Sequence, residues 1–460
     1  MKISRRHFIK TAAYSTGASL TPLSLTLPTS AMANSESDYK ALVCLFFYGG
    51  NDSFNMVLPA DGNNLINYQN SRPDIQLYPH ELVNNRSIED DVGQTLSLNG
   101  AMPNISELIL SGAATTLLNV GTLIEPTTKQ NYNSVKKPPN LGAHNKQQLA
   151  WQRSWNTSEY HPYGWAGMMM DFLATGTEGV SPAFSLGTNN WLNGQSTESL
   201  ALSSQGVRAM NALTDFTINR NLTRLLSSNS ASIYGKTYLD RFQQVYDYQN
   251  TLTSVLEQYP ADESIPSGFL GGQFKMVKRM VQASTALGQA RQVYFVAFGG
   301  FDNHRDQRGK HEALLGQVDS ALSAFYSSLK SVGLEDKVIT FTMSDFGRTI
   351  ENNSNRGTDH GWGSNQLIIG GPIKGRKAHG TFPEFIRDGK DAVGNKFIPT
   401  VASEQYAATL CKWFGLSDTA VDYIFPTLSP DNENPFNSRY LNFIKGLNKD
   451  KNQMKGKGKM

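Results

Sequence analysis

Acidic and histidine residues follow several apolar segments of the sequence, at positions where a metal ion or an ester could bind. In chain order these candidates are Asp52 and Ser53, Asp302 and His304, Asp345 and Arg348, and Asp359 and His360. Several carboxylates gathered at one edge of a sheet would repel one another unless a cation compensates their charge. The pattern therefore indicates a divalent metal centre.

The mixture of side chains narrows the choice of metal. Carboxylate oxygens combined with imidazole nitrogens suit Zn, Mn or Fe, whereas an all-oxygen set would suit Mg or Ca. We expect one or two ions, Zn or Mn before others. Such an ion lowers the pKa of a bound water or polarises an ester oxygen, and Arg348 could hold an anionic group through two hydrogen bonds. This chemistry is hydrolysis of a phosphate or sulfate ester, with an anionic small molecule or polymer as substrate.

Each candidate also has a structural interpretation. A single aspartate after a strand is commonly a turn residue or a helix cap, so Asp52 or Asp345 alone would mean little. Asp302 with His304 could equally form a structural hydrogen-bonded pair, and so could the pair at 359–360 within its glycine-bounded loop. The shared metal centre is favoured because these sites recur after successive apolar segments.

Three further histidines, His144, His311 and His379, lie outside these pairs. His144 lies in a segment that reads as a loop entering a helix, and a helix N-terminus, which favours anions, could place it at the site. A capping or surface role for His144 is the alternative. We expect His311 and His379 on the surface or in loops.

Five apolar segments read as strands that are buried on both faces, as in a parallel sheet. They are 41–48, 115–120, 293–298, 338–343 and 366–369. Apolar residues at helical spacing predict helices over 274–287, 310–329 and 404–414. The last has Ser403 as a candidate N-cap and Gly415 beyond its end. Strands alternating with helices predict an α/β fold with a mainly parallel central sheet flanked by helices, which binds ligands beyond the carboxyl ends of its strands.

The chain after the first 33 residues is expected to contain one domain with an insertion, followed by a tail. Residues 34–445 would form a single large α/β domain, with the Asn-, Ser- and Thr-rich stretch 188–232 as an irregular or helical cap insertion. Residues 446–460 read as a basic disordered tail.

The N-terminus has the pattern of a twin-arginine signal peptide. Arg5-Arg6 precede Phe8 and a mildly apolar stretch over 11–27, and 31–33 reads as an Ala-x-Ala cleavage site. Residues 1–33 would be removed after passage through the twin-arginine export machinery, so the mature protein would be periplasmic or secreted. The apolar stretch is too short and too hydroxylated for a stable membrane span, which needs about 20 apolar residues.

The composition and the absence of certain motifs disfavour several classes of function. The formal charge is +3 at pH 7, and much of the excess lies in the signal and the tail, so nucleic-acid binding is not indicated. The two cysteines, Cys44 and Cys411, stand in apolar contexts and read as buried thiols. The sequence has no G-x-S-x-G, H-E-x-x-H, G-x-G-x-x-G or Walker motif, which disfavours serine hydrolases, zincins and dinucleotide enzymes.

Together these motifs resemble the exported bacterial proteins of domain-of-unknown-function family 1501. The segments that carry the resemblance are Arg5-Arg6, 45–59, 144–147, 301–307, 344–349 and 357–362. The family is similar in fold to the alkaline phosphatase and sulfatase superfamily, so the resemblance implies metal-dependent ester hydrolysis. By position it implies these metal ligands: Asp52, Asp302, His304, Asp345, Asp359 and His360.

Two positions depart from the pattern expected of the family. Asp345 stands where glutamate is expected, and Ala143 stands where a serine is expected before His144. If that serine is the nucleophile, Ser53 or a metal-bound water would have to attack instead. The alternative function is a noncatalytic exported binding or assembly protein that keeps the phosphatase-like fold, and Ala143 favours it.

Overall fold

The structure is a computed structural model that describes residues 39–156, 159–173, 180–206, 220–221, 224, 233–430 and 434–447. The predicted signal peptide, about half of the predicted cap insertion and nearly all of the predicted basic tail lie outside these ranges. The described residues from Tyr39 onward fall in one compact unit.

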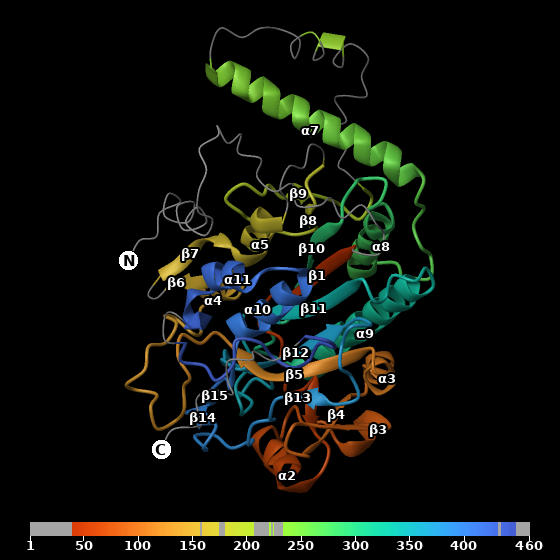
Figure 1. Cartoon of the computed structure of the whole chain (residues 1–460). Helices are drawn as coiled ribbons and strands as arrows, with labels where there is room; N and C mark the ends of the chain where they lie inside the picture. Colours follow the sequence, from red (N-terminus) through yellow and green to blue (C-terminus); the bar gives the residue numbers. More distant parts are fainter. Residues whose placement is uncertain are drawn as a thin grey trace. The chain divides into compact units, whose positions relative to one another are not determined.

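A nine-stranded sheet forms the centre of this unit, in the order β13-β5-β12-β11-β1-β10-β8-β9, with β16 paired to β5 (Figure 1). The five long strands are β1 (Lys40–Phe47), β5 (Ala114–Gly121), β10 (Arg291–Phe298), β11 (Val338–Ser344) and β12 (Ser364–Ile369). The short strands are β8 (Ala183–Ser185), β9 (Leu200–Ala201), β13 (Ala378–His379) and β16 (Val401–Ala402). All five predicted apolar strands are confirmed.

The strand β12 runs antiparallel to both of its neighbours, β11 and β5, whereas the other pairings of this sheet are parallel. The connection from β11 to β12 spans 345–363 and contains no helix in the described structure. Because the chain returns from the edge at which β11 ends, β12 must run in the opposite direction. The sheet is therefore mainly parallel, as predicted. The antiparallel strand β12 is preceded by a long loop, which lies at the carboxyl ends of the parallel strands.

Alternating side chains of β1 divide the core into two layers. Val43 and Phe47 pack with helices α3 (Pro103–Ser111), α8 (Phe269–Gln282) and α9 (Gln307–Lys330). Leu42 and Phe46 lie in a second cluster with α5 (Trp165–Leu173), α10 (Ser403–Phe414) and α11 (Asp418–Ile424). The helices therefore cover both faces of the sheet, and Figure 1 shows α10 and α11 on one side with α8 and α9 on the other.

The predicted helices are confirmed as α8, α9 and α10, with shifted ends. Ser403 is the first residue of α10 and not its cap, because Ala402 takes the N-cap position in an extended conformation. Gly415 follows the helix at φ 122° and donates to the carbonyl of Cys411, as expected for a glycine at a helix end. Cys44 and Cys411 are buried and free.

The remaining elements lie around this core. Three strands form a small antiparallel sheet in the order β2-β4-β3: β2 (Val57–Pro59), β3 (Leu82–Glu89) and β4 (Thr95–Asn99). Two hairpins are formed by β6 (Arg153–Asn156) with β7 (Glu159–Gly164) and by β14 (Ala392–Val393) with β15 (Lys396–Phe397). The other helices are α2 (Gly62–Ser71), α4 (His144–Gln152) and α7 (Ile233–Glu257), and the short 3-10 turns are Pro79–Glu81 and Pro426–Leu428.

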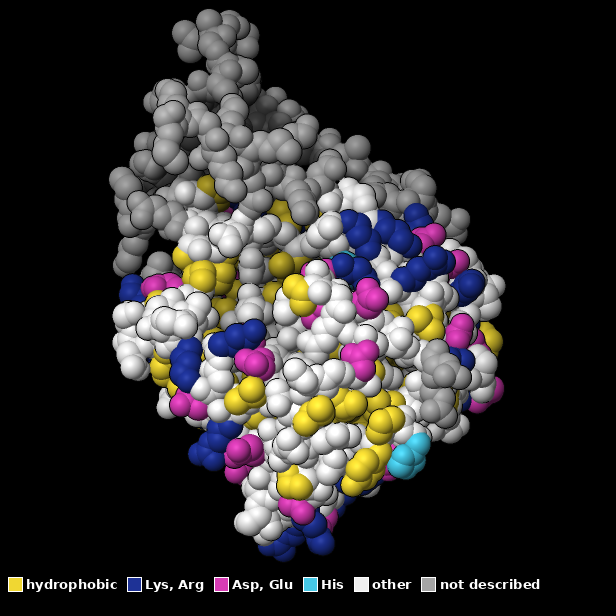
Figure 2. Space-filling model, turned by 90° about the horizontal axis from the view of Figure 1, so that it is seen from below, with side chains coloured by type: hydrophobic (Ala, Val, Ile, Leu, Met, Phe, Trp, Pro, Cys, Tyr) yellow, Lys and Arg dark blue, Asp and Glu magenta, His cyan; other side chains and the backbone are white. Residues whose placement is uncertain are grey.

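The surface carries charges of both signs. Figure 2 shows one face on which basic and acidic side chains are interspersed among uncharged ones, with Lys and Arg densest toward one edge. Across the described ranges, no helix combines the length and the apolar character that a membrane crossing requires.

Candidate metal centre

Three neighbouring strands end at the edge of the sheet where the predicted site residues lie. β10, β1 and β11 are adjacent and parallel, so the loops that follow them begin side by side. The loop after β10 carries Asp302 and His304, and the loop after β11 carries Asp345 and His360. The backbone N–H of Gly49, after β1, donates to Asp345 Oδ2 at 3.1 Å. Parallel topology thus brings together residues far apart in the chain.

The turn after β1 depends on two glycines. Gly49 and Gly50 have φ values of 109° and 81°, in the left-handed region that favours glycine. A Cβ atom at Gly49 would lie 2.5 Å from the backbone nitrogen of Asp302, and one at Gly50 would lie 2.5 Å from the ring of Phe346. The absence of side chains at both positions therefore lets β1 end directly against the loops that follow β10 and β11.

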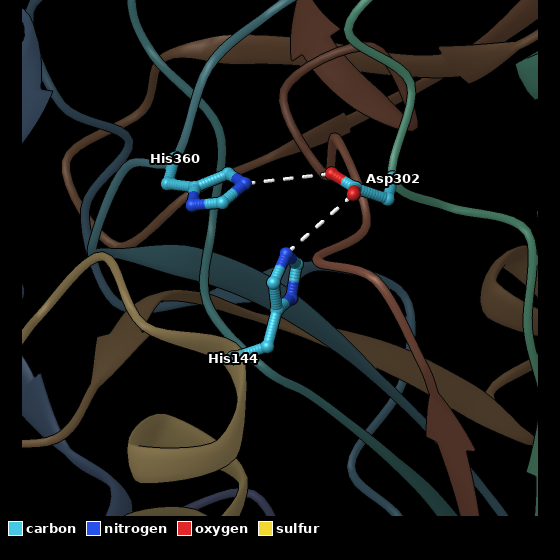
Figure 3. Close-up of side chains that lie close together, drawn as sticks. All are labelled: His144, Asp302 and His360. Carbon is cyan, nitrogen blue, oxygen red and sulfur yellow. Dashed lines mark ion pairs between the residues drawn. The ribbon is translucent and has the colours of Figure 1, made fainter.

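His144, Asp302 and His360 form the centre of the site (Figure 3). One ligand atom from each lies within 4.8 Å of the others. The Nε2 atom of His144 is 3.6 Å from Asp302 Oδ2, and that of His360 is 3.4 Å from Asp302 Oδ1. The arrangement offers two imidazole nitrogens and one carboxylate to a single ion. Such three-residue sets hold catalytic zinc and leave a further coordination position open.

A second group of contacts orients the imidazole rings. His144 Nδ1 is 2.6 Å from Asp345 Oδ2, and His360 Nδ1 is 2.7 Å from the carbonyl oxygen of Gly142. A carbonyl oxygen only accepts, so Nδ1 of His360 carries the hydrogen and Nε2 of the neutral ring is left as a ligand atom. Partners of this kind are typical of metal-binding histidines.

His304 lies against this group. Its Nε2 atom is 3.0 Å from Asp302 Oδ1 and 2.9 Å from His360 Nε2, and its Nδ1 atom is 2.9 Å from Asp359 Oδ1. Two nitrogen lone pairs facing each other at 2.9 Å repel, so this contact needs a proton or a cation between the rings. His304 and Asp359 therefore form an imidazole–carboxylate pair beside the three candidate ligands.

The charges around Asp302 favour its ionised form. Burial alone would raise the pKa of Asp302, but the hydrogen bond and charge of Arg348, together with His304 and His144, lower it below the ordinary value. Burial lowers the pKa of His360 despite its bond to Gly142, so its imidazole is neutral at pH 7 and available to a metal.

Asp345 is the fully buried carboxylate of the site. Its Oδ2 atom also accepts from Gln148 Nε2 at 3.1 Å, while its Oδ1 atom is buried without a hydrogen-bond partner among the described residues. Burial raises the pKa of Asp345, although the bonds from His144 and Gln148 oppose the rise. Asp345, predicted as a ligand, thus contacts the Nδ1 side of the His144 ring and is not one of the three residues that converge.

Arg348 directs its guanidinium into the protein. It donates to the carbonyl oxygens of Gly49, Gly50, Phe301 and Thr358, and its Nη2 atom is 2.7 Å from Asp302 Oδ1. Its side chain has no exposed surface. Arg348 thus holds Asp302 and the glycine turn in place. The sequence had instead predicted that its guanidinium binds an anionic group of the substrate.

The amino-acid sequence was compared with models of known protein families. Residues 39–425 match the family described as protein of unknown function (DUF1501). The chain belongs to the DUF1501 family. This confirms the family expected from the motifs. None of the curated proteins compared with this DUF1501 chain matches it.

Solved structures similar to the DUF1501 protein are remote. The C-terminal periplasmic domain of EcEptC from Escherichia coli, in complex with Zn, is 10% identical, with a TM-score of 0.35, and the match covers 89% of this chain and 92% of that one. Two others are the PsFucS1 sulfatase from Pseudoalteromonas sp. and a protein in the alkaline phosphatase superfamily from Vibrio parahaemolyticus. Each is 11% identical, with a TM-score of 0.34, and each match covers 83% of this chain and 68% of the other. At TM-scores below 0.5 these likenesses decide nothing about function.

Two predicted site residues of the DUF1501 protein lie apart from the cluster. Asp52 is 2% exposed and pairs with Arg72, whose Nη1 atom is 2.7 Å from Asp52 Oδ2. Gln307 also donates to Asp52. Ser53 is fully buried, and its hydroxyl oxygen accepts from the backbone N–H of Asn365 at 2.7 Å. The structure thus gives Asp52 an internal ion pair and Ser53 an internal hydrogen bond.

The expected surface positions of His311 and His379 were wrong. His311 is 2% exposed and lies on the face of α9 that packs on the sheet, where Nε2 is 2.8 Å from Asn51 Oδ1. His379, in β13, is 8% exposed and contacts the carbonyl oxygen of Lys374. The burial of His311 could have been predicted from its spacing, because Leu315 follows it by one helical turn on the same buried face.

Sequence reasoning missed three contributors to the site and its surroundings. The carbonyl of Gly142 and the amide of Gln148 orient the histidine and carboxylate groups, and Arg72 neutralises Asp52. Backbone carbonyls have no sequence signature, and Arg72 follows no apolar strand. Of the three, Gln148 could have been predicted from the sequence, because it lies four residues after His144 and therefore on the same side of α4.

Proposed function

We propose that this protein is a metal-dependent hydrolase of phosphate or sulfate esters, with His144, Asp302 and His360 as the metal ligands. The observation that carries the proposal is the convergence of these three ligand atoms within 4.8 Å, with each imidazole Nδ1 held by an oxygen. Zn or Mn suits this donor set of nitrogen and oxygen.

The charges of the site fit a divalent ion. Asp302, Asp345 and Asp359 are three carboxylates, and Arg348 is the one guanidinium among them, so three negative charges minus one positive charge leave an excess of two. A divalent cation balances that excess, which removes the mutual repulsion expected from the sequence.

A bound divalent ion would polarise the ester and lower the pKa of a water molecule. Ala143 carries no hydroxyl next to His144, and Ser53 is buried, so we propose water as the nucleophile. His304 is 42% exposed and paired with Asp359, which suits it to take a proton from the water and return it to the leaving group. Arg348 keeps Asp302 ionised and oriented throughout.

The test begins with elemental analysis of mature protein purified without chelators. We expect close to one Zn or Mn per chain in the wild type and a loss in both Asp302→Ala and His360→Ala, with unchanged circular dichroism. The wild type should hydrolyse generic phosphate or sulfate monoesters, and His304→Gln should keep the metal but lose activity. Absence of bound metal, with none taken up on titration, would contradict the proposal.

The second candidate function is a noncatalytic exported binding or assembly protein that retains the fold and the metal. Ala143 at the start of α4 and the burial of Ser53 favour it, because neither position presents a hydroxyl nucleophile at the cluster. Stoichiometric metal in a wild-type protein that hydrolyses none of a broad panel of phosphate and sulfate esters would support this candidate over the hydrolase.

We also propose that residues 1–33 direct export by the twin-arginine pathway, which places the mature protein in the periplasm or outside the cell. The paired Arg5-Arg6, the apolar stretch and the Ala-x-Ala site support this proposal. The pathway carries folded proteins, so the metal would be bound before export.

A further inference from the structure

A cavity of about 320 Å³ adjoins the metal centre. Its lining residues come from the loop before α4, from the loop before β12 and from the β14–β15 hairpin: Tyr132, Lys137, Pro138, Asn140, Leu141, Gly142, Trp362, Val393 and Lys396. This volume lies at the small end of the range for ligand pockets, about 300 to 1,000 Å³. None of these lining residues is acidic, and two are lysines.

The two lysines have different environments. Lys137 is held by its own loop, because its ammonium donates to the carbonyl oxygens of Tyr132 and Val135 and lies 4.4 Å from the centre of the Tyr132 ring. Lys396 is half-buried, and within the described ranges the structure shows no hydrogen bond or ion pair for its ammonium. The cavity therefore contains a positive charge that no described carboxylate neutralises.

Gly142 joins the cavity to the metal centre. Its carbonyl oxygen holds His360 Nδ1, and a Cβ atom at Gly142 would lie 3.7 Å from His360 Cβ and 3.8 Å from Lys396 Nζ. Trp362, two residues after His360, forms another wall and is anchored by a 2.9 Å hydrogen bond from its Nε1 to the carbonyl of Thr122. A ligand in the cavity would thus lie next to a group bound at the metal.

We propose that this cavity binds a second anionic group, a sulfate or a phosphate, of the same ester substrate. The proposal rests on the proposed function for its reacting group and adds the substrate class: esters that carry at least two anionic groups on one organic scaffold. Lys396 would bind the second group through a charge-assisted hydrogen bond, and Leu141, Val393 and Trp362 would contact the scaffold.

The experiment measures binding, not turnover. Isothermal titration calorimetry compares a disulfated disaccharide, its bisphosphorylated counterpart and the unmodified disaccharide. All proteins are metal-loaded and carry His304→Gln, which should keep the metal but prevent hydrolysis of the ligand during the titration. In this background we compare the wild-type residue Lys396 with Lys396→Gln, with Lys396→Arg and, as a matched control, with Lys330→Gln at the exposed end of α9. Lys396→Gln should bind the dianionic ligands about tenfold more weakly, because a hydrogen bond to a charged group is lost. Lys396→Arg and Lys330→Gln should bind like the wild type, and the preferred ligand identifies sulfate or phosphate.

The same comparison in an Asp302→Ala background separates this proposal from the proposed function. Lys396→Gln should weaken binding there by a similar factor, even if the protein binds no metal and hydrolyses no ester. Circular dichroism of each variant checks the fold. Equal binding by wild type and Lys396→Gln, or equal binding of the unmodified disaccharide, would overturn the inference.

Discussion

At the scale of single residues, the candidate site depends on groups that contact the three proposed ligands from behind. Asp345 holds His144 through a 2.6 Å contact, Gly142 holds His360, and Arg348 holds Asp302. Each partner fixes which atom of its neighbour is free to bind a metal. Residues of this kind can be tested without removing a ligand.

Asp345→Asn is expected to weaken metal binding by about 10- to 100-fold. The shape is kept, but the carboxylate that orients the His144 ring is lost. Competition titration with a chelating dye measures the affinity. Asp319→Asn is the control and should leave the affinity unchanged, because this buried carboxylate on α9 bonds to Asn104 and Ile105 of α3 and to none of the site residues. Wild-type affinity in Asp345→Asn would contradict an orienting role.

His311 should make the folded state sensitive to acid. Burial lowers the pKa of His311 to about 4, against the opposing charge of Asp52, whereas the unfolded chain has an ordinary value of about 6.5. The unfolded state then binds more protons between these values, so stability is lost as pH falls from about 6.5 to 4, by up to about 3 kcal/mol. Urea unfolding of wild type and His311→Gln across this range should give a shallower pH dependence in the variant. Parallel curves would contradict the assignment.

At the scale of elements, the glycine turn after β1 and the helix-free loop between β11 and β12 assemble the site. The loop brings Asp345, Arg348 and His360 to one edge because β12 returns antiparallel. The turn lets this loop approach, since Gly50 lies against Phe346. A larger side chain at Gly50 would disturb the close packing between the turn and the loop.

Gly50→Ala and Gly93→Ala form a matched pair. Their φ values are 81° and 82°, so both alanines bear a similar backbone strain of about 1–2 kcal/mol. A Cβ atom at Gly93 meets nothing within 4 Å, whereas one at Gly50 meets the Phe346 ring at 2.5 Å. Gly50→Ala should therefore lose about 1–3 kcal/mol more in urea unfolding, and should also lose metal. Equal losses in the two variants would show that the contact with Phe346 does not matter.

At the scale of the whole molecule, the features to consider are the surface charge and the N-terminal segment that is proposed to direct export. Charges of both signs are mixed over the face in Figure 2. The export proposal rests on Arg5 and Arg6, which lie outside the described residues.

Replacing both arginines by lysine should block export. The Arg5→Lys/Arg6→Lys variant keeps the positive charge, so a loss of export would reflect recognition of the arginine pair and not charge alone. Immunoblots of cytoplasmic and periplasmic fractions should show precursor retained in the cytoplasm. Lys10→Arg, which also changes one basic side chain of the segment, should be exported normally. Export of the double variant would contradict the twin-arginine route.

The sequence by itself determined the central strands, the helices α8 to α10 and the residue types of the site. Buried strands and helices leave local periodicities, and polar residues after parallel strands must gather at one edge. The tertiary structure alone decided that Asp52 pairs with Arg72, that Gly142 holds His360, and that β12 runs antiparallel. His144 and Asp345 are 201 positions apart in the chain, and Gly142 and His360 are 218 apart. Contacts over such separations depend on how irregular loops pack, and no local pattern records that packing.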